Sequence, residues 1–75
     1  MYHTIEFATE LMVDLETSAK EPLDRLWIQR GVRRRAQIKP FVMQTSRGPV
    51  EVADLFFEDG TATRTVPFFC FSFVD

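Results

Sequence analysis

Apolar and polar residues alternate with a period of two through the first part of the chain. Between Thr4 and Glu16 the odd positions are mainly apolar and the even positions mainly polar or acidic. This period indicates a β-strand with one buried face and one solvated face. A strand of this length in a small sheet is expected to bend, and Ala8-Thr9 is the expected place. The odd positions are Ile5, Phe7, Thr9, Leu11, Val13 and Leu15.

Residues 18–30 admit two structures. Ser18 followed three residues later by Glu21 matches a helix capping box, and Gly31 is a suitable helix terminator. Pro22 and the strand-favouring triplet Leu26-Trp27-Ile28 oppose a complete helix. We therefore expect one helical turn followed by a short strand, while a helix over residues 19–30 stays open.

A second alternating run begins after Gly31 and continues to Val42. Pro40 interrupts it, and because proline cannot donate to a sheet ladder, it marks an edge position or a bulge. Turn signals follow at residues 46–49 and 58–60, and they separate expected strands at 50–57, 61–66 and 68–74. Turns at such short intervals are typical of an all-β sandwich or barrel.

The sequence therefore predicts a single, mainly β domain over residues 1–75. We expect a small antiparallel barrel or a strongly curved sheet of five to six strands. The comparison with SH3-like barrels is one of architecture and carries no functional argument. A chain of 75 residues buries only about 60% of its unfolded surface, so oligomerisation is expected to supplement its core.

Two residue types limit the other ways to stabilise so short a chain. Cys70 is the single cysteine, which excludes an intrachain disulfide and suits a reducing, cytoplasmic compartment. His3 is the single histidine and has no neighbour at metal-ligand spacing, so no metal site is expected. The longest uncharged apolar stretch, residues 65–74, is too short for a membrane-spanning helix, and no membrane partner is expected.

Charge is sorted into three blocks although the net charge is only −2. Residues 1–24 contain six acids and one base, residues 25–47 contain seven bases and no acid, and residues 48–75 contain five acids and one base. Either the blocks neutralise one another in the fold, or the basic block faces a partner.

The partner reading makes the basic run a nucleic-acid surface. Forked guanidinium groups match phosphate oxygens, and the flanking aromatic residues Trp27 and Phe41 could stack on bases. The residues expected to contact a polyanion are Arg30, Arg33, Arg35 and Lys39.

The neutralisation reading, which we favour, pairs the basic run with the acidic first strand. Glu6, Glu10 and Asp14 would form a cross-strand ladder with Arg33, Arg35 and Lys39 on the solvated face. Arg34, on the inward parity, would then need an acid near the end of the barrel or a place beside the bulge. Asp54 is a candidate inward acid that could pair with Arg34 or Arg64. An acidic isoelectric point near 5.3 also opposes long-range attraction of a polyanion.

The last expected strand is aromatic on both faces. Phe69, Phe71 and Phe73 share one parity, and one small core can cover only one face of such a strand. We therefore expect these three side chains to form an oligomer interface. The alternative is that Phe68 closes one end of the barrel while the small residues Cys70 and Ser72 lie under a loop. Cys70, flanked by phenylalanines, is expected to be a small buried hydrophobe rather than a nucleophile.

No pattern in the chain indicates catalysis. His3 lies close to the first residue, no glycine-rich phosphate loop occurs, and the acidic cluster at 54–59 lacks the spacing of a calcium loop. No catalytic residue or cofactor is expected. The expected function is a non-enzymatic interaction or assembly module that binds itself or another protein. A nucleic-acid-binding barrel is the alternative, and a small enzyme or ligand carrier ranks third.

Overall fold

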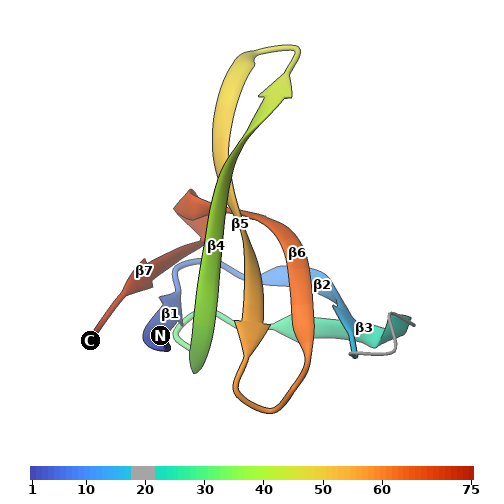
Figure 1. Cartoon of the computed structure of the whole chain (residues 1–75), viewed down its shortest axis with the longest axis vertical. Coiled ribbons are helices and arrows are strands. Elements are labelled where there is room, and N and C mark those ends of the chain that lie inside the picture. Colours follow the sequence, from blue (N-terminus) through green and yellow to red (C-terminus); the bar gives the residue numbers. More distant parts are fainter. Residues whose placement is uncertain (18–21) are drawn as a thin grey trace.

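The computed structural model describes residues 1–17 and 22–75 and forms a single curled antiparallel sheet (Figure 1). Within this part of the chain the sheet has the strand order β3-β2-β6-β5-β4-β1-β7 and the shape of a half-barrel. The elements are β1 (His3–Phe7), β2 (Leu11–Glu16), β3 (Pro22–Ile28), β4 (Arg33–Thr45), β5 (Gly48–Phe57), β6 (Ala62–Pro67), the 3₁₀ turn η1 (Phe68–Cys70) and β7 (Phe71–Phe73). The predicted mainly β fold is confirmed, with seven strands in place of five to six.

The first alternating run accounts for one of the additional strands. It breaks at residues 8–10, so that β1 pairs with β4 and β7 while β2 pairs with β3 and β6. The predicted bend is correct, and the predicted continuous strand is wrong. Backbone bonds fix the end of β1: Phe7 N–H donates to Val32 O at 2.9 Å, and Ala8 N–H donates to Cys70 O at 2.8 Å.

Residues 22–28 form β3, which pairs with β2 from Leu11↔Ile28 onward. The strand prediction for Leu26-Trp27-Ile28 is thus confirmed, and a helix continuing to residue 30 is wrong. The predicted helical turn at 18–21 lies outside the described residues. Ile28 enters the core while Trp27 stays half exposed, as expected for alternating positions of a strand.

The β4–β5 hairpin is longer than the strands beside it. Thr45 pairs with Gly48 around the two-residue turn Ser46-Arg47, and Gly48 has a φ of +105° that an L side chain rarely adopts. On the two flanks, β4 pairs with β1 only as far as Ala36, and β5 pairs with β6 only from Val52. The outer half of the hairpin, residues 41–51, therefore extends beyond the sheet at the top of Figure 1, and we call it the arm.

Both free edges at the arm carry a proline. Backbone groups of alternate residues in a strand point to the same neighbour. The carbonyl of Val32, directly before β4, accepts from Phe7 of β1, while the Arg35 carbonyl accepts from Glu58, directly after β5. Pro40 is at an even position beyond the end of β1. Its backbone nitrogen, which has no hydrogen to donate, therefore points to the free edge of β4, as the sequence predicted. Gly48 faces Thr45 of β4, so the next residue of β5, Pro49, points its backbone nitrogen to the opposite side. That side is the free edge of β5.

The core fills the concave side of the half-barrel. It is formed by residues of the first alternating run that were predicted to point inward and by every second residue of β5. Its buried members are Ile5, Phe7, Val13, Ile28, Ala36, Ala53, Leu55, Phe57, Val66, Cys70 and Phe71. Burial raises the pKa of the Cys70 thiol, which agrees with its predicted role as a small buried hydrophobe.

The predicted continuous aromatic strand over residues 68–74 is wrong. Pro67 ends β6, and the chain passes through η1 before the short β7. A 3₁₀ turn has three residues per turn, so the period of two is lost across it. Phe71 is consequently buried at 5% exposure, whereas Phe69 is 75% and Phe73 49% exposed. Phe71 and Phe73, two residues apart on β7, still lie together with 6.1 Å between their ring centroids, whereas Phe69 lies on η1.

We predict that Leu55→Ala lowers the free energy of unfolding by about 2–5 kcal/mol, since Leu55 is completely buried and truncation leaves a cavity. Met12→Ala is the control, because this exposed side chain should contribute less than about 0.5 kcal/mol. Urea unfolding of the two variants measures the difference. Equal midpoints would contradict the assignment of the core.

Candidate functional site

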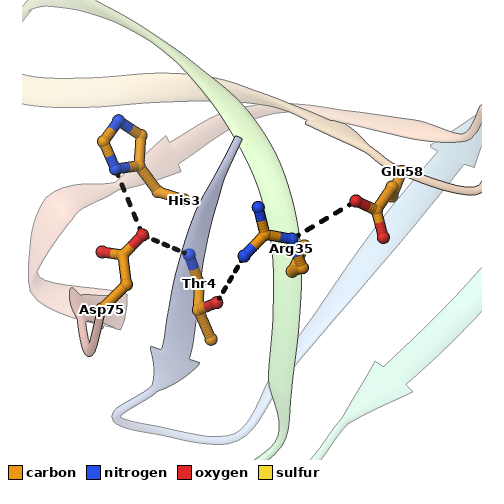
Figure 2. A network of polar contacts seen from close by, with 5 residues as sticks. All are labelled: His3, Thr4, Arg35, Glu58 and Asp75. Atoms are coloured by element: carbon orange, nitrogen blue, oxygen red, sulfur yellow. Dashed lines mark hydrogen bonds and ion pairs between the residues drawn. The ribbon is translucent and has the colours of Figure 1, made fainter. Parts of the chain in front are cut away.

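The arginines of β4 are largely neutralised by acids within the fold. Arg33 and Glu6 are direct cross-strand partners, with 2.9 Å between Arg33 Nε and Glu6 Oε1. Arg35 Nε donates to Glu58 Oε2 at 3.3 Å, and its Nη1 donates to Thr4 Oγ1 at 3.2 Å (Figure 2). Cross-strand neutralisation is therefore confirmed where β1 lies beside β4.

Arg34, the inward-parity arginine, also finds the type of partner that the sequence required. Its Nη1 lies 3.8 Å from Asp59 Oδ2 in the β5–β6 turn, and its guanidinium lies 5.3 Å from the centre of the Phe57 ring. Hydrogen bonds from Thr61 hold the pKa of Asp59 below its usual value, with a smaller contribution from Arg34. The acid at the end of the half-barrel is thus a turn residue.

The predicted acidic ladder is correct only at its first member. Because the first run breaks after β1, Asp14 lies on β2, where it faces Arg25 of β3 in register, with 3.3 Å between Arg25 Nε and Asp14 Oδ1. Glu10 falls in the connection between the strands. Lys39 is the register partner of Asp54 instead.

Three bases have no ion pair among the residues that the structure describes: Arg30, Lys39 and Arg47. They are dispersed rather than clustered. Arg30 precedes β4, Lys39 lies in its middle, and Arg47 lies in the turn of the arm. At 3.3 Å per residue, Lys39 and Arg47 are separated by about 20 Å along the hairpin. The expected polyanion contacts Arg30, Arg33, Arg35 and Lys39 do not form one continuous unpaired surface.

The end of the chain is tied to β1 by the network in Figure 2. Asp75 Oδ2 accepts the Thr4 N–H at 3.0 Å and lies 3.5 Å from His3 Nδ1. The Thr4 bond, followed by the charge of His3, holds the pKa of Asp75 below its usual value. The His3 ring meets the Phe73 ring edge-on at 5.2 Å between centroids. These contacts partly cover Phe73 and leave Phe69 as the most exposed aromatic side chain.

A second polar network lies on the outer face, around Arg64 of β6. Arg64 Nε donates to Glu16 Oε2 at 3.0 Å and its Nη1 to Asp54 Oδ2 at 3.2 Å, while its guanidinium lies 5.3 Å from the centre of the Phe56 ring. Both carboxylates raise the pKa of Arg64, Glu16 more strongly. The predicted pairing of Asp54 with Arg64 is confirmed. Its inward placement is wrong, because Asp54 alternates with the core residues Ala53 and Leu55.

Asp54 also supports an unusual backbone at Thr65. Two residues of β6, Arg64 and Thr65, oppose the single Asp54 of β5, which defines a β-bulge. Thr65 has a φ of +59°, uncommon for a β-branched residue. Its N–H donates to Asp54 Oδ1 at 3.0 Å. With only 14% of its side chain exposed, Asp54 thus bonds the bulge with both oxygens.

Exposed apolar side chains gather on the arm and on η1. Phe41, Val42 and Met43 are exposed, Val42 at 57%. Since Val42 alternates with the other two, both faces of the arm are apolar. Pro40, Phe41, Val42, Glu51 and Phe68 line a shallow groove of about 280 Å³, which brings η1 beside the base of the arm. Phe69 follows directly in the chain.

Sequence reasoning missed the apolar arm, since it expected Val42 to point inward. The signal was the length of the hairpin strands. The strand of residues 33–45 has 13 residues, whereas the strand of residues 3–7 that is available to flank it has 5. The excess length has no neighbour to cover it.

The described part of the chain holds no group of three or more His, Cys, Asp or Glu side chains arranged to bind a metal ion. Among residues 1–17 and 22–75, no helix has the length and apolar character needed to cross a lipid bilayer. Comparison with protein-family models, curated proteins and solved structures found no match. Any functional argument therefore depends on the exposed surfaces themselves.

We predict that Asp54→Ala destabilises the fold by about 1–3 kcal/mol, because it removes the acceptor of a nearly buried hydrogen bond and one of the two acids on Arg64. Asp14→Ala is the matched control, since its ion pair with Arg25 is well exposed and should contribute less than about 1 kcal/mol. Chemical unfolding of both variants gives the comparison. An equal effect of the two changes would show that Asp54 does not support the bulge.

Thr65→Gly is predicted to raise the free energy of unfolding by up to about 1 kcal/mol, because glycine adopts a positive φ without the cost that an L side chain incurs. The control is Gln37→Gly, at an exposed position of β4 with ordinary φ, which should destabilise by about 0.5–1 kcal/mol. Thermal unfolding checks the opposite signs. A loss of stability in both variants would mean that Thr65 is not strained.

Proposed function

We propose that this protein is a non-enzymatic assembly module that associates with a second copy of itself through the arm and Phe69. The observation that carries the proposal is an extended hairpin arm with apolar side chains on both faces and no core of its own. A two-stranded hairpin is marginally stable in water by itself. A partner that covers its apolar faces would stabilise it.

The arm and η1 together offer a self-complementary surface. A protruding side chain, Phe69, lies next in sequence to Phe68, which lines the groove with Pro40, Phe41 and Val42. A projection and a depression within one patch allow two copies to exchange contacts about a two-fold axis, which is the commonest symmetry of homo-oligomers. Aromatic anchors in pockets are typical of the residues that dominate binding energy.

The proposed contact is made by faces rather than by strand edges. Pro40 and Pro49 each place a missing donor on a free edge of the hairpin, and prolines at edges oppose pairing with a further strand. Side chains must then supply the contact. Of the three phenylalanines that the sequence nominated, Phe69 stays in this proposal, whereas Phe71 belongs to the core of its own copy.

The size of the chain supports the same proposal. A domain of 75 residues has a small core, and oligomerisation is one of the usual ways in which such domains gain stability. The single cysteine is buried and reduced, which suits a cytoplasmic protein. Binding of nucleic acid is the weaker candidate, because acids within the fold already pair with Arg33, Arg34 and Arg35.

Sedimentation equilibrium tests the proposal. We predict a dimer at micromolar concentration, and we expect Phe69→Ser or Phe41→Ser to raise the dissociation constant at least about tenfold, which corresponds to 1.4 kcal/mol. Both side chains are exposed, so the monomer should keep its fold and its circular dichroism.

Trp27→Ser is the matched control, since it removes from β3, outside the proposed surface, an aromatic side chain whose exposure lies between those of Phe41 and Phe69. It should leave the dissociation constant unchanged. A wild-type monomer at all accessible concentrations, or an equal weakening by all three substitutions, would falsify self-association through the arm.

A further inference from the structure

A cleft separates β2 from β6 although the two strands are neighbours in the sheet. Among the residues that the structure describes, they pair only at Glu16↔Ala62. Between them lies a cavity of about 370 Å³, lined by residues 11–14, Glu16 and residues 63–67. Its walls are the edges of β2 and β6 that are turned toward each other, rather than the side-chain faces of the sheet.

Backbone groups on both walls point into this cleft. Alternate residues of a strand direct their N–H and C=O groups to the same side, so Asp14 and Arg64, two residues from the Glu16–Ala62 pair, face one another without pairing. Met12 follows on the β2 wall. On the far side, β2 is paired with β3 and β6 with β5, so both strands are held in place.

The bulge explains why β6 turns away from β2. Arg64 and Thr65 together oppose Asp54, and the left-handed Thr65 redirects the strand toward Pro67. Asp54 fixes this conformation through Thr65 N–H and Arg64, and Glu16 fixes Arg64 from the β2 side. The open state of the cleft is thus maintained by specific contacts. Strained backbone of this kind is concentrated at functional sites.

We propose that the cleft binds an extended segment of a partner protein, in which apolar residues alternate with basic ones, by adding a strand between β2 and β6. Only an extended chain can offer donors and acceptors to two facing strand edges at once. Apolar residues of the guest would lie toward Leu11, Val13 and Val66 on the core side. This site is separate from the arm, and the proposal stands whether or not the protein dimerises.

The charge at the mouth of the cleft selects the basic residues of the guest. On the outer face, three carboxylates (Asp14, Glu16 and Asp54) stand beside two guanidinium groups (Arg25 and Arg64). Asp14 is the most exposed of the three carboxylates. A lysine or arginine of the guest would meet the exposed carboxylate of Asp14, whereas a glutamate would be repelled by it.

An acetylated, amidated hexapeptide of alternating valine and lysine is the probe, titrated into the full ¹⁵N-labelled chain. We expect shifted and exchange-protected amides at Met12, Asp14 and Arg64, and unchanged amides over residues 41–51. The same peptide N-methylated at its internal amides keeps the side chains but loses the backbone donors, so it should bind at least about tenfold more weakly. A valine–glutamate peptide should also bind more weakly.

Asp14→Lys should lower the affinity for the valine–lysine peptide several-fold. The matched charge reversal Glu51→Lys on the arm should leave this affinity unchanged. Both positions are exposed, so both variants should fold. No binding of the lysine peptide at millimolar concentration overturns the proposal. Three other results would also overturn it: the N-methylated peptide binds as tightly as the unmodified one, the shifted amides are confined to the arm, or the two charge reversals weaken binding equally.

Discussion

The fold depends on the antiparallel pairing of β4 with β5, which runs without interruption from Ala36↔Phe57 to Thr45↔Gly48. These two strands stand at the centre of the sheet order, with β1 and β7 on one flank and β6, β2 and β3 on the other. Ala36 of β4 and Ala53, Leu55 and Phe57 of β5 belong to the buried core cluster. The same pairing continues beyond the core, and this excess produces the arm. One interaction thus builds both the hydrophobic interior and the most apolar part of the surface.

Charge sorting along the sequence follows from this architecture. The basic block lies mainly on β4, so it is placed between the acids of β1 and those of the β5–β6 turn. Exposed ion pairs of this kind contribute little stability each. They do oppose a register shift of β4, because a slip by one residue would turn Arg33 and Arg35 toward the core and Ala36 away from it. The distribution of charge along the sequence therefore contributes more to the choice of strand partners than to the stability of the sheet.

Periodicity in the sequence predicted the fold class, the turns at 46–49 and 58–60, and the inward residues of the first run, because each depends on local chemistry. It did not predict that this run divides into β1 and β2 on opposite sides of the sheet, since that depends on long-range bonds from Phe7 and Ala8. It also failed at residues 68–70, where a 3₁₀ turn replaces a strand of high β-propensity after Pro67. For the site, the predicted Asp54–Arg64 pair formed, whereas the left-handed Thr65 carries no sequence signal of its own.

The arm and the cleft between β2 and β6 differ in whether their strand edges can accept a further strand. This difference favours different partners for the two surfaces. The edges of the arm carry Pro40 and Pro49, which remove donors and discourage a further strand, so only the faces of the arm remain available. The walls of the cleft between β2 and β6 carry no proline at Met12, Asp14 or Arg64, so each of these residues has a backbone N–H. Proline thus discourages strand addition at the arm, while the two walls of the cleft keep their backbone donors at these positions. Strand addition at the cleft and side-chain packing at the arm are therefore compatible in one molecule.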